Sequence, residues 1–168
     1  MLPTDRESPG LGRGEEVKDS SGVIAPPPLI FAGGLVVGLL LGVAVQPPAL
    51  PVMLAWPVGG LLILAGLALG FSFISAFRRA QTPVDPRQAT RTIVTTGAYR
   101  FTRNPAYLGM ALIYTGIALA TGGTWALITL IPTLVLVDRG VIAREERYLE
   151  QKFGAEYTTL KTRVRRWL

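Results

Sequence analysis

Residues 97–109 read Gly97-Ala-Tyr-Arg-Phe-Thr-Arg-Asn-Pro-Ala-Tyr-Leu-Gly109, and the remaining sequence is organised around them. This basic stretch is rich in tyrosine and arginine, and an Asn-Pro pair leads from it into an apolar segment. A second polar cluster, Arg144-Glu145-Glu146-Arg147, follows the next two apolar segments. We expect the two clusters to meet at one face of a membrane and to form a cofactor site.

The composition narrows the chemistry that the chain can perform. It has 168 residues, enough for one domain, with a net charge of +6. The absence of cysteine excludes disulfides and thiolate chemistry, and the absence of histidine removes the commonest general base and metal ligand. Carboxylates, tyrosines, arginines, hydroxyls and backbone groups therefore remain for catalysis, and we expect no metal site.

Four apolar segments predict an all-α integral membrane protein with four transmembrane helices. A bilayer core of about 30 Å requires about 20 residues of helix. The turn Gly122-Gly123 is too short for anything but an antiparallel helical hairpin between the last two spans. We expect a disordered cytoplasmic tail over residues 1–25 and a single domain over 26–168. The expected spans are 28–45, 52–76, 105–121 and 124–138.

The residues after the last span predict cytoplasmic amphipathic C-terminal helices. Apolar residues recur there at steps of three and four, the helical period, and Gly154 predicts a break between two helical pieces. Of the lysines and arginines, three precede the first span, six lie in the central loop and eight follow the last span. The positive-inside rule therefore places both termini in the cytoplasm of a multi-pass protein of the plasma or inner membrane. This distribution also explains the basic charge without a nucleic-acid partner.

Five motifs in the second half of the chain carry a family resemblance. They are Gly97-Ala-Tyr99, Arg103-Asn104-Pro105-Ala-Tyr107-Leu-Gly109, Glu145-Glu146-x-x-Leu149, Phe153-Gly154-x-Glu-Tyr157 and Arg163-Val-Arg-Arg-Trp167. In this order and spacing they resemble the isoprenylcysteine carboxyl methyltransferase and phospholipid methyltransferase group of membrane enzymes. The match covers residues 91–167. Asn104 stands where the family pattern has histidine, a replacement that we associate with bacterial members.

The resemblance implies an S-adenosylmethionine-dependent methyltransferase whose cofactor lies at the cytoplasmic side. A carboxylate such as Glu145 suits the ammonium group of this cofactor, and tyrosine faces suit its adenine ring and sulfonium cation. Carried over by position, the cofactor-binding residues are Arg91, Thr92, Ile93, Val94, Tyr99, Asn104, Pro105, Ala106, Tyr107 and Glu145.

Two pairs of charged residues are further candidates. Arg103 would pair with the cofactor carboxylate or with a neighbouring glutamate, and Glu146 would be a weak base for an amine acceptor, so both are assigned a catalytic role. Prenylcysteine-specific members have a substrate-binding arginine where this chain has Val141, and Arg139 or Arg144 would compensate. The expected partners are membrane lipids and a lipophilic acceptor, which is the carboxylate of a prenylcysteine-like molecule or a phospholipid amine.

Three other interpretations of these residues remain open. The first is a membrane reductase resembling steroid reductases, which would bind NADPH. The second is a non-catalytic membrane protein with a decayed pocket. The third is that the arginines and tyrosines only anchor the protein at the membrane boundary, as such residues commonly do.

Overall fold

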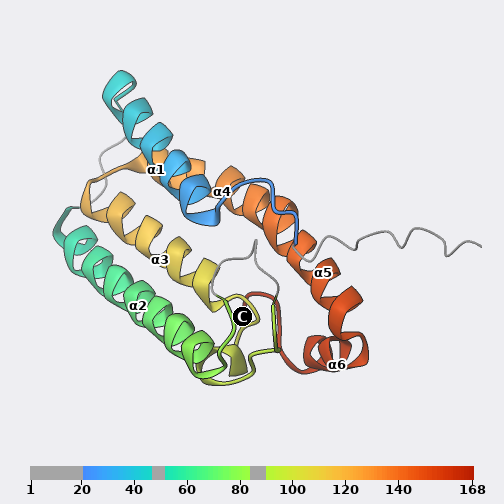
Figure 1. Cartoon of the computed structure of the whole chain (residues 1–168). Helices are drawn as coiled ribbons and strands as arrows, with labels where there is room; N and C mark the ends of the chain where they lie inside the picture. Colours follow the sequence, from blue (N-terminus) through green and yellow to red (C-terminus); the bar gives the residue numbers. More distant parts are fainter. Residues whose placement is uncertain (1–20, 47–51, 84–89) are drawn as a thin grey trace, which may run out of the picture.

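The structure is a computed structural model that describes residues 21–46, 52–83 and 90–168. These residues form helices and no strand, as the apolar segments predict. Four long helices are α1 (Pro27–Ala44), α2 (Val52–Arg79), α3 (Pro105–Ala120) and α4 (Thr124–Val137) (Figure 1). Shorter elements are the 3-10 helix η1 (Gly97–Arg100), the π-helical turn η2 (Asp138–Ile142), α5 (Ala143–Phe153) and α6 (Ala155–Arg163).

Helices α2 and α3 lie side by side because glycines let their backbones approach closely (Figure 1). Gly66 faces Gly109, and Gly59 faces Gly116 one step further along. A Cβ atom on Gly66 would lie 2.5 Å from the carbonyl oxygen of Gly109, and one on Gly116 would lie 2.6 Å from that of Gly59. Neither contact is sterically possible, so these positions require glycine at the present helix separation.

Helix α1 packs along α4 and completes the bundle around a small core. A Cβ atom on Gly38 would lie 2.4 Å from the Cα atom of Ala126, so this contact is also very close. The ring of Phe31 meets that of Tyr114 edge-on at 6.5 Å between centroids. The Tyr114 hydroxyl shares a hydrogen bond of 2.9 Å with Thr129 Oγ1, which satisfies the polar end of this buried side chain.

Three helices are long and apolar enough to cross a membrane, namely Pro27–Ala44, Ala55–Arg79 and Thr124–Phe153. Helix α3, at 16 residues, is apolar but shorter. Large apolar side chains such as Leu61, Leu64 and Phe71 of α2 are exposed, as expected for surfaces that contact lipid. The chain is therefore an all-α membrane protein, and the expected span at 105–121 stays a prediction.

The last span continues into the polar C-terminal region without a loop. Helix α4 ends at Val137, the turn η2 follows directly, and α5 begins at Ala143, so that one rod runs over Thr124–Phe153. The span expected from the sequence ends at residue 138, whereas the helix continues to Phe153. Charged residues begin at Asp138, so we treat α4 as the membrane-spanning part and α5 as lying outside the bilayer core.

Both glycine breaks lie where the sequence predicts them. Gly122 has a φ of +63° in the turn between α3 and α4. Gly154 has a φ of +52° between α5 and α6, a left-handed conformation that favours glycine. The second break turns α6 back toward the base of α3, and this return brings Tyr157 to the site described below.

The expected tail 1–25 lies largely outside the described residues. Its described part, 21–25, contacts η2 and the start of α5. The N–H of Ile24 donates to the carbonyl of Gly140 at 3.5 Å, and the Arg144 guanidinium donates to the carbonyl of Gly22 at 3.0 Å. Ser21 is buried there and lies at the edge of the main cavity.

Candidate functional site

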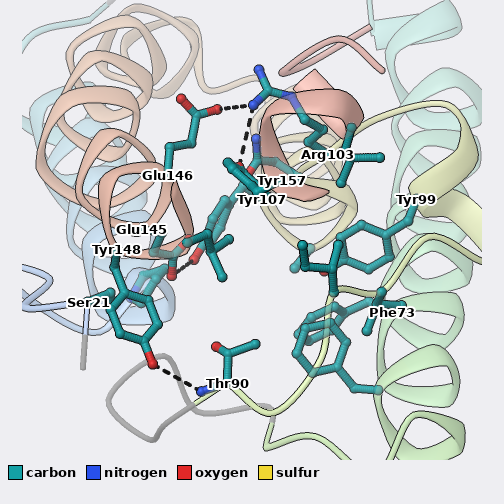
Figure 2. Close-up of a pocket in the computed structure, with 18 of the residues that line it drawn as sticks. Ser21, Phe73, Thr90, Tyr99, Arg103, Tyr107, Glu145, Glu146, Tyr148 and Tyr157 are labelled. Carbon is teal, nitrogen blue, oxygen red and sulfur yellow. Dashed lines mark hydrogen bonds and ion pairs between the residues drawn. The ribbon is translucent and has the colours of Figure 1, made fainter. Parts of the chain in front are cut away.

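A cavity of about 240 Å³ lies where α2 ends, α3 begins and α5 and α6 converge (Figure 2). Segments far apart in the sequence contribute to its wall, including the loop 90–94 and η1. Aromatic and aliphatic side chains form most of this wall, and a few polar groups interrupt it. The polar and charged residues at its surface are Ser21, Thr90, Thr92, Tyr99, Arg103, Asn104, Tyr107, Glu145, Glu146, Tyr148 and Tyr157.

Glu145 accepts a hydrogen bond of 2.7 Å from the hydroxyl of Tyr107. The helical hairpin α3–α4 brings these two residues together from positions 38 apart in the chain. Burial raises the pKa of Glu145 to about 7, the Tyr107 hydrogen bond counteracts part of this rise, and the charge of Glu146 adds to it. Glu145 is thus a carboxyl group that changes its charge near neutral pH at the surface of the cavity.

Glu146 lies between two guanidinium groups, in contrast to its neighbour. Its Oε1 atom is 2.7 Å from Nη1 of Arg103, and the two side chains are only 7% and 9% exposed. Arg166 donates from Nε to Oε1 at 3.2 Å and from Nη2 to Oε2 at 2.5 Å. Arg103 Nη1 also lies 3.4 Å from the Tyr157 hydroxyl. Both carboxylate oxygens of Glu146 are therefore occupied by cationic donors.

Arg103 lines the cavity and has one buried donor without a partner. Among the buried side-chain polar atoms of the described residues, its Nε alone has no hydrogen-bond partner. A buried donor without a partner is costly, and such groups normally have a partner in protein, water or ligand. The Arg103 side chain thus has hydrogen-bonding capacity beyond its ion pair with Glu146.

Aromatic rings form the wall across the cavity from Glu145 (Figure 2). The centroids of Tyr99 and Phe77 are 5.9 Å apart, those of Tyr99 and Phe73 are 6.5 Å apart, and the two phenylalanines are at 4.6 Å. Burial, together with the charge of Glu145, raises the pKa of Tyr99 far above its usual range, so its hydroxyl stays neutral. This surface suits a planar ring or a cation.

A bridge between Tyr148 and the loop 90–94 limits another side of the cavity (Figure 2). The N–H of Thr90 donates to the Tyr148 hydroxyl at 3.3 Å. Lys152 donates to the same hydroxyl at 3.0 Å and lies 5.4 Å from the centre of the ring. Helix α5 therefore contributes both an ionisable group, Glu145, and a rigid aromatic boundary one turn later.

Most of the residues assigned from the sequence meet at this cavity. The structure brings together Thr92, Ile93, Val94, Tyr99, Arg103, Asn104, Ala106, Tyr107, Glu145 and Glu146. Asn104 also has a structural contact, because its side-chain amide donates to the carbonyl of Arg166 at 2.9 Å. The Asn104 amide nitrogen is therefore already bonded to the protein, and the amide oxygen is the atom left for a cofactor contact.

Four of the assigned residues lie outside the cavity lining. Arg91 is exposed, and its N–H donates to Thr82 Oγ1 at 3.0 Å. Pro105 is buried at the first position of α3, where its fixed φ favours helix initiation. Arg144 bonds the segment 21–25, and Arg139 lies at a separate hollow beside Leu108 and Trp167. The arginines that were expected to replace a substrate-binding residue at position 141 therefore do not reach this cavity.

Sequence reasoning missed several residues of the wall. Phe73 lies within the expected span 52–76 and Phe77 directly after it, although their position in the last two turns of α2, next to Arg78, signals the membrane boundary. Tyr148, Met110 and Ser21 also line the cavity. Within the described ranges, no group of three or more metal-ligating side chains lies close enough to hold a metal ion.

Comparison with known proteins gives a family match across this region. A family model described as phospholipid methyltransferase matches residues 54–156, which is 103 of 168 positions. A curated protein of Haemophilus influenzae is 44% identical over 62 residues, covering 37% of this chain and 98% of that protein. It is described only as an uncharacterized protein. No solved structure matches. The family match agrees with the resemblance in the sequence motifs.

Proposed function

The chain belongs to the phospholipid methyltransferase family, and on that premise we propose that it transfers a methyl group from S-adenosylmethionine to a lipophilic acceptor. Family membership makes it a membrane methyltransferase. The cofactor, the acceptor and the membrane face are the proposed parts. We place the cofactor in the cavity between α2, α3, α5 and α6, and the cavity on the cytoplasmic side together with both termini.

The observation that carries this proposal is the presence of Glu145 and Arg103 in one cavity. The amino-acid end of S-adenosylmethionine has an ammonium group and a carboxylate group. Buried charges require partners of opposite sign, and the two side chains supply one for each ligand charge. The guanidinium charge of Arg103 suits a carboxylate group, and Glu145 suits the ammonium group when it is ionised.

The aromatic wall suits the same ligand, and the size of the cavity argues against a larger one. Tyr99, Phe73 and Phe77 offer ring faces for stacking with adenine and for contact with a sulfonium cation. Small-molecule sites usually occupy roughly 300–1,000 Å³. A cavity of about 240 Å³ is small even for a mononucleoside ligand, which disfavours a nicotinamide dinucleotide and hence the reductase alternative.

The chemistry needs orientation more than proton transfer. A bound S-adenosylmethionine supplies an activated methyl carbon, to which an acceptor lone pair bonds as the carbon–sulfur bond breaks and a neutral sulfide leaves. Glu145 and Arg103 would fix one end of the ligand, and the aromatic wall would fix the other. A carboxylate acceptor has no proton to lose, whereas an amine acceptor must be neutral before it reacts.

We reassign Glu146, which the sequence analysis offers as a base for an amine acceptor. Three cationic donors of Arg103 and Arg166 contact its two oxygens, an arrangement that suits an ion pair better than proton abstraction. We assign it instead to holding Arg103 at the cavity. Either acceptor class, a prenylcysteine-like carboxylate or a phospholipid amine, remains compatible with the residues present.

Calorimetry with purified protein tests the cofactor assignment. We expect S-adenosylhomocysteine to bind and Glu145→Gln to weaken binding about tenfold or more, since a charge pair in a partly buried site is lost. Glu156→Gln is the matched control, because Glu156 is exposed on α6 and is not part of the cavity lining. Absence of binding to the wild type, or equal binding by the Glu145 variant, would refute the assignment.

The acceptor requires a separate assay. Labelled methyl transfer from S-adenosylmethionine should be measured against extracted membrane lipids and against prenylcysteine analogues. Incorporation into one of these pools would identify the acceptor class. A protein that binds S-adenosylhomocysteine but labels neither pool would overturn the proposed acceptor while leaving the cofactor assignment intact.

A further inference from the structure

We propose that Arg166 is a positioning residue of the cavity, which acts through Glu146 to hold the Arg103 guanidinium in place. The segment 164–168 is then part of the functional site although it does not line the cavity. This inference depends on the proposed function only for the identity of the ligand used to measure it.

The segment 164–168 returns to the turn before α3, and the end of the chain lies at the base of that helix (Figure 1). Three donors of the turn bond two successive carbonyls of the returning segment. They are the N–H of Arg103 to Arg165 at 3.0 Å, the Thr102 hydroxyl to Arg166 at 3.1 Å and the Asn104 amide to Arg166 at 2.9 Å. The backbone of Arg166 is thus fixed directly against the residues that flank Arg103.

The side chain of Arg166 connects two carboxylates. Besides its two bonds to Glu146, its Nη1 donates to the two oxygens of Asp138 at 3.2 and 3.0 Å. The indole N–H of Trp167 donates to the same Asp138 at 3.1 Å. Two guanidiniums and two carboxylates therefore balance one another, and Arg103 and Glu146 lie at the buried end of this network.

Arg166 cannot act on the ligand directly, because it does not line the cavity. Its effect must pass through Glu146, whose side chain is 7% exposed and contacts both arginines. Without Arg166, this carboxylate loses the donor on Oε2 and one of the two on Oε1, and it can rotate with Arg103. A long arginine side chain released in this way loses the orientation that a bound carboxylate needs.

The first test compares charge removal at two adjacent positions. Arg166→Gln should weaken binding of S-adenosylhomocysteine about 10- to 100-fold, the range known for removal of groups that orient metal ligands. Arg165→Gln is the matched control, because that side chain is exposed, and it should stay within about twofold of wild type. Arg166→Lys should restore only part of the affinity, since lysine keeps the charge but not the paired donors.

The second test separates positioning from a general loss of folding. In a Glu146→Gln background, Arg166→Gln should cause little further loss of affinity, because the connecting residue has already changed. Equal losses from Arg166→Gln in both backgrounds would overturn the proposal, as would wild-type affinity of Arg166→Gln.

A ligand-free measurement keeps this inference independent of the cofactor assignment. Thermal unfolding midpoints should be measured for Arg103→Gln, Arg166→Gln and the double variant. We expect a non-additive effect, because both arginines contact one carboxylate. If the wild type binds no S-adenosylhomocysteine while the effect is non-additive, the proposed function fails and the positioning link stands. Additive effects would refute the link itself.

Discussion

Glu145 and Glu146 follow one another on α5, but the first has a neutral partner and the second has cationic partners. Glu145 accepts a hydrogen bond of 2.7 Å from the neutral hydroxyl of Tyr107. Glu146 lies between the guanidinium groups of Arg103 and Arg166. One carboxyl group is thereby left able to change its charge and to pair with a ligand cation. The other is fully engaged in a fixed ion network. Adjacent residues of one type thus divide ligand binding and positioning between them.

The pKa of Glu145 predicts opposite pH trends for affinity and stability. Burial raises this pKa from 4.5 to about 7, so the group is neutral below that pH and cannot pair with an ammonium ion. Affinity for S-adenosylhomocysteine should therefore increase as pH rises from about 6 to about 8. Because the folded-state pKa is the higher one, the free energy of unfolding without ligand should decrease as pH rises from 4.5 toward 7. Calorimetry and thermal unfolding at several pH values measure the two trends. Glu145→Gln should remove both of them. A wild-type affinity that does not change with pH would contradict the prediction.

Removal of the Tyr107 hydroxyl should shift this pH response. The hydroxyl lowers the pKa of Glu145 by donating to its carboxylate, so Tyr107→Phe should move the midpoint of binding to higher pH. At pH 7 we expect affinity to fall about tenfold, equivalent to about 1.5 kcal/mol, the lower end for one hydrogen bond to a charged group. Tyr114→Phe is the control, since that hydroxyl bonds Thr129 away from the cavity. An unchanged midpoint in Tyr107→Phe would argue against this hydrogen bond.

Glycines of α2 should differ sharply in their tolerance of alanine. Gly66→Ala places a methyl group 2.5 Å from the Gly109 carbonyl, so α2 and α3 must separate, at a cost of about 1–3 kcal/mol. Gly70→Ala lies on the same helix with nothing within 4 Å and should be neutral or stabilising by about 0.5–1 kcal/mol. Thermal unfolding in detergent measures both. Equal melting temperatures would show that the helices are not in this close contact.

The two phenylalanines near the end of α2 predict a contrast in ligand affinity. Phe73→Ala removes a ring from the aromatic wall and should weaken S-adenosylhomocysteine binding by about 0.5–1.5 kcal/mol or more. Phe71→Ala removes the same group from a side chain that is 74% exposed on the lipid-facing surface, and it should leave affinity unchanged. Calorimetry on both variants measures the difference, and a larger loss for Phe71→Ala would place the ligand elsewhere.

Single cysteines can test the number of spans and their orientation, because the chain has no cysteine of its own. Gln81, Thr121 and Thr162 are exposed at the end of α2, in the turn after α3 and on α6. If α3 and α4 both cross the membrane, Gln81→Cys and Thr162→Cys should react with an impermeant thiol reagent from the cytoplasmic side only. Thr121→Cys should react from the opposite side only. Labelling of all three from one side would contradict the four-span topology.

The sequence predicts the positions of the helices better than it predicts the contacts between them. The apolar segments and the glycines at positions 122 and 154 place the helix ends well, because hydropathy and backbone conformation are local properties. The rod over Thr124–Phe153 is missed because the charges that begin at Asp138 resemble the end of a helix. A π-helical turn lets the helix continue through them, and no residue pattern marked it.

In the candidate site, too, contacts set by neighbouring helices are predictable from the sequence, and contacts with a distant segment are not. Motif order predicts that Tyr107 and Glu145 share a cavity, because a helical hairpin must return to the same face. The partner of Glu146 is not predictable in this way. Whether Glu146 pairs with Arg103 alone or also with Arg166 depends on the path of the segment 164–168. Hydrogen bonds to the turn before α3 set this path. Arg139 and Arg144, the residues expected to compensate for Val141, do not line the cavity.

The return of the segment 164–168 to the turn before α3 also orders the events of biosynthesis. A ribosome makes all four apolar helices, and Glu146, before it reaches Arg166. Up to that point the buried carboxylate has only Arg103 as a cationic partner. The balanced ion network can form only once translation has passed residue 166, so the last residues to be made complete the site.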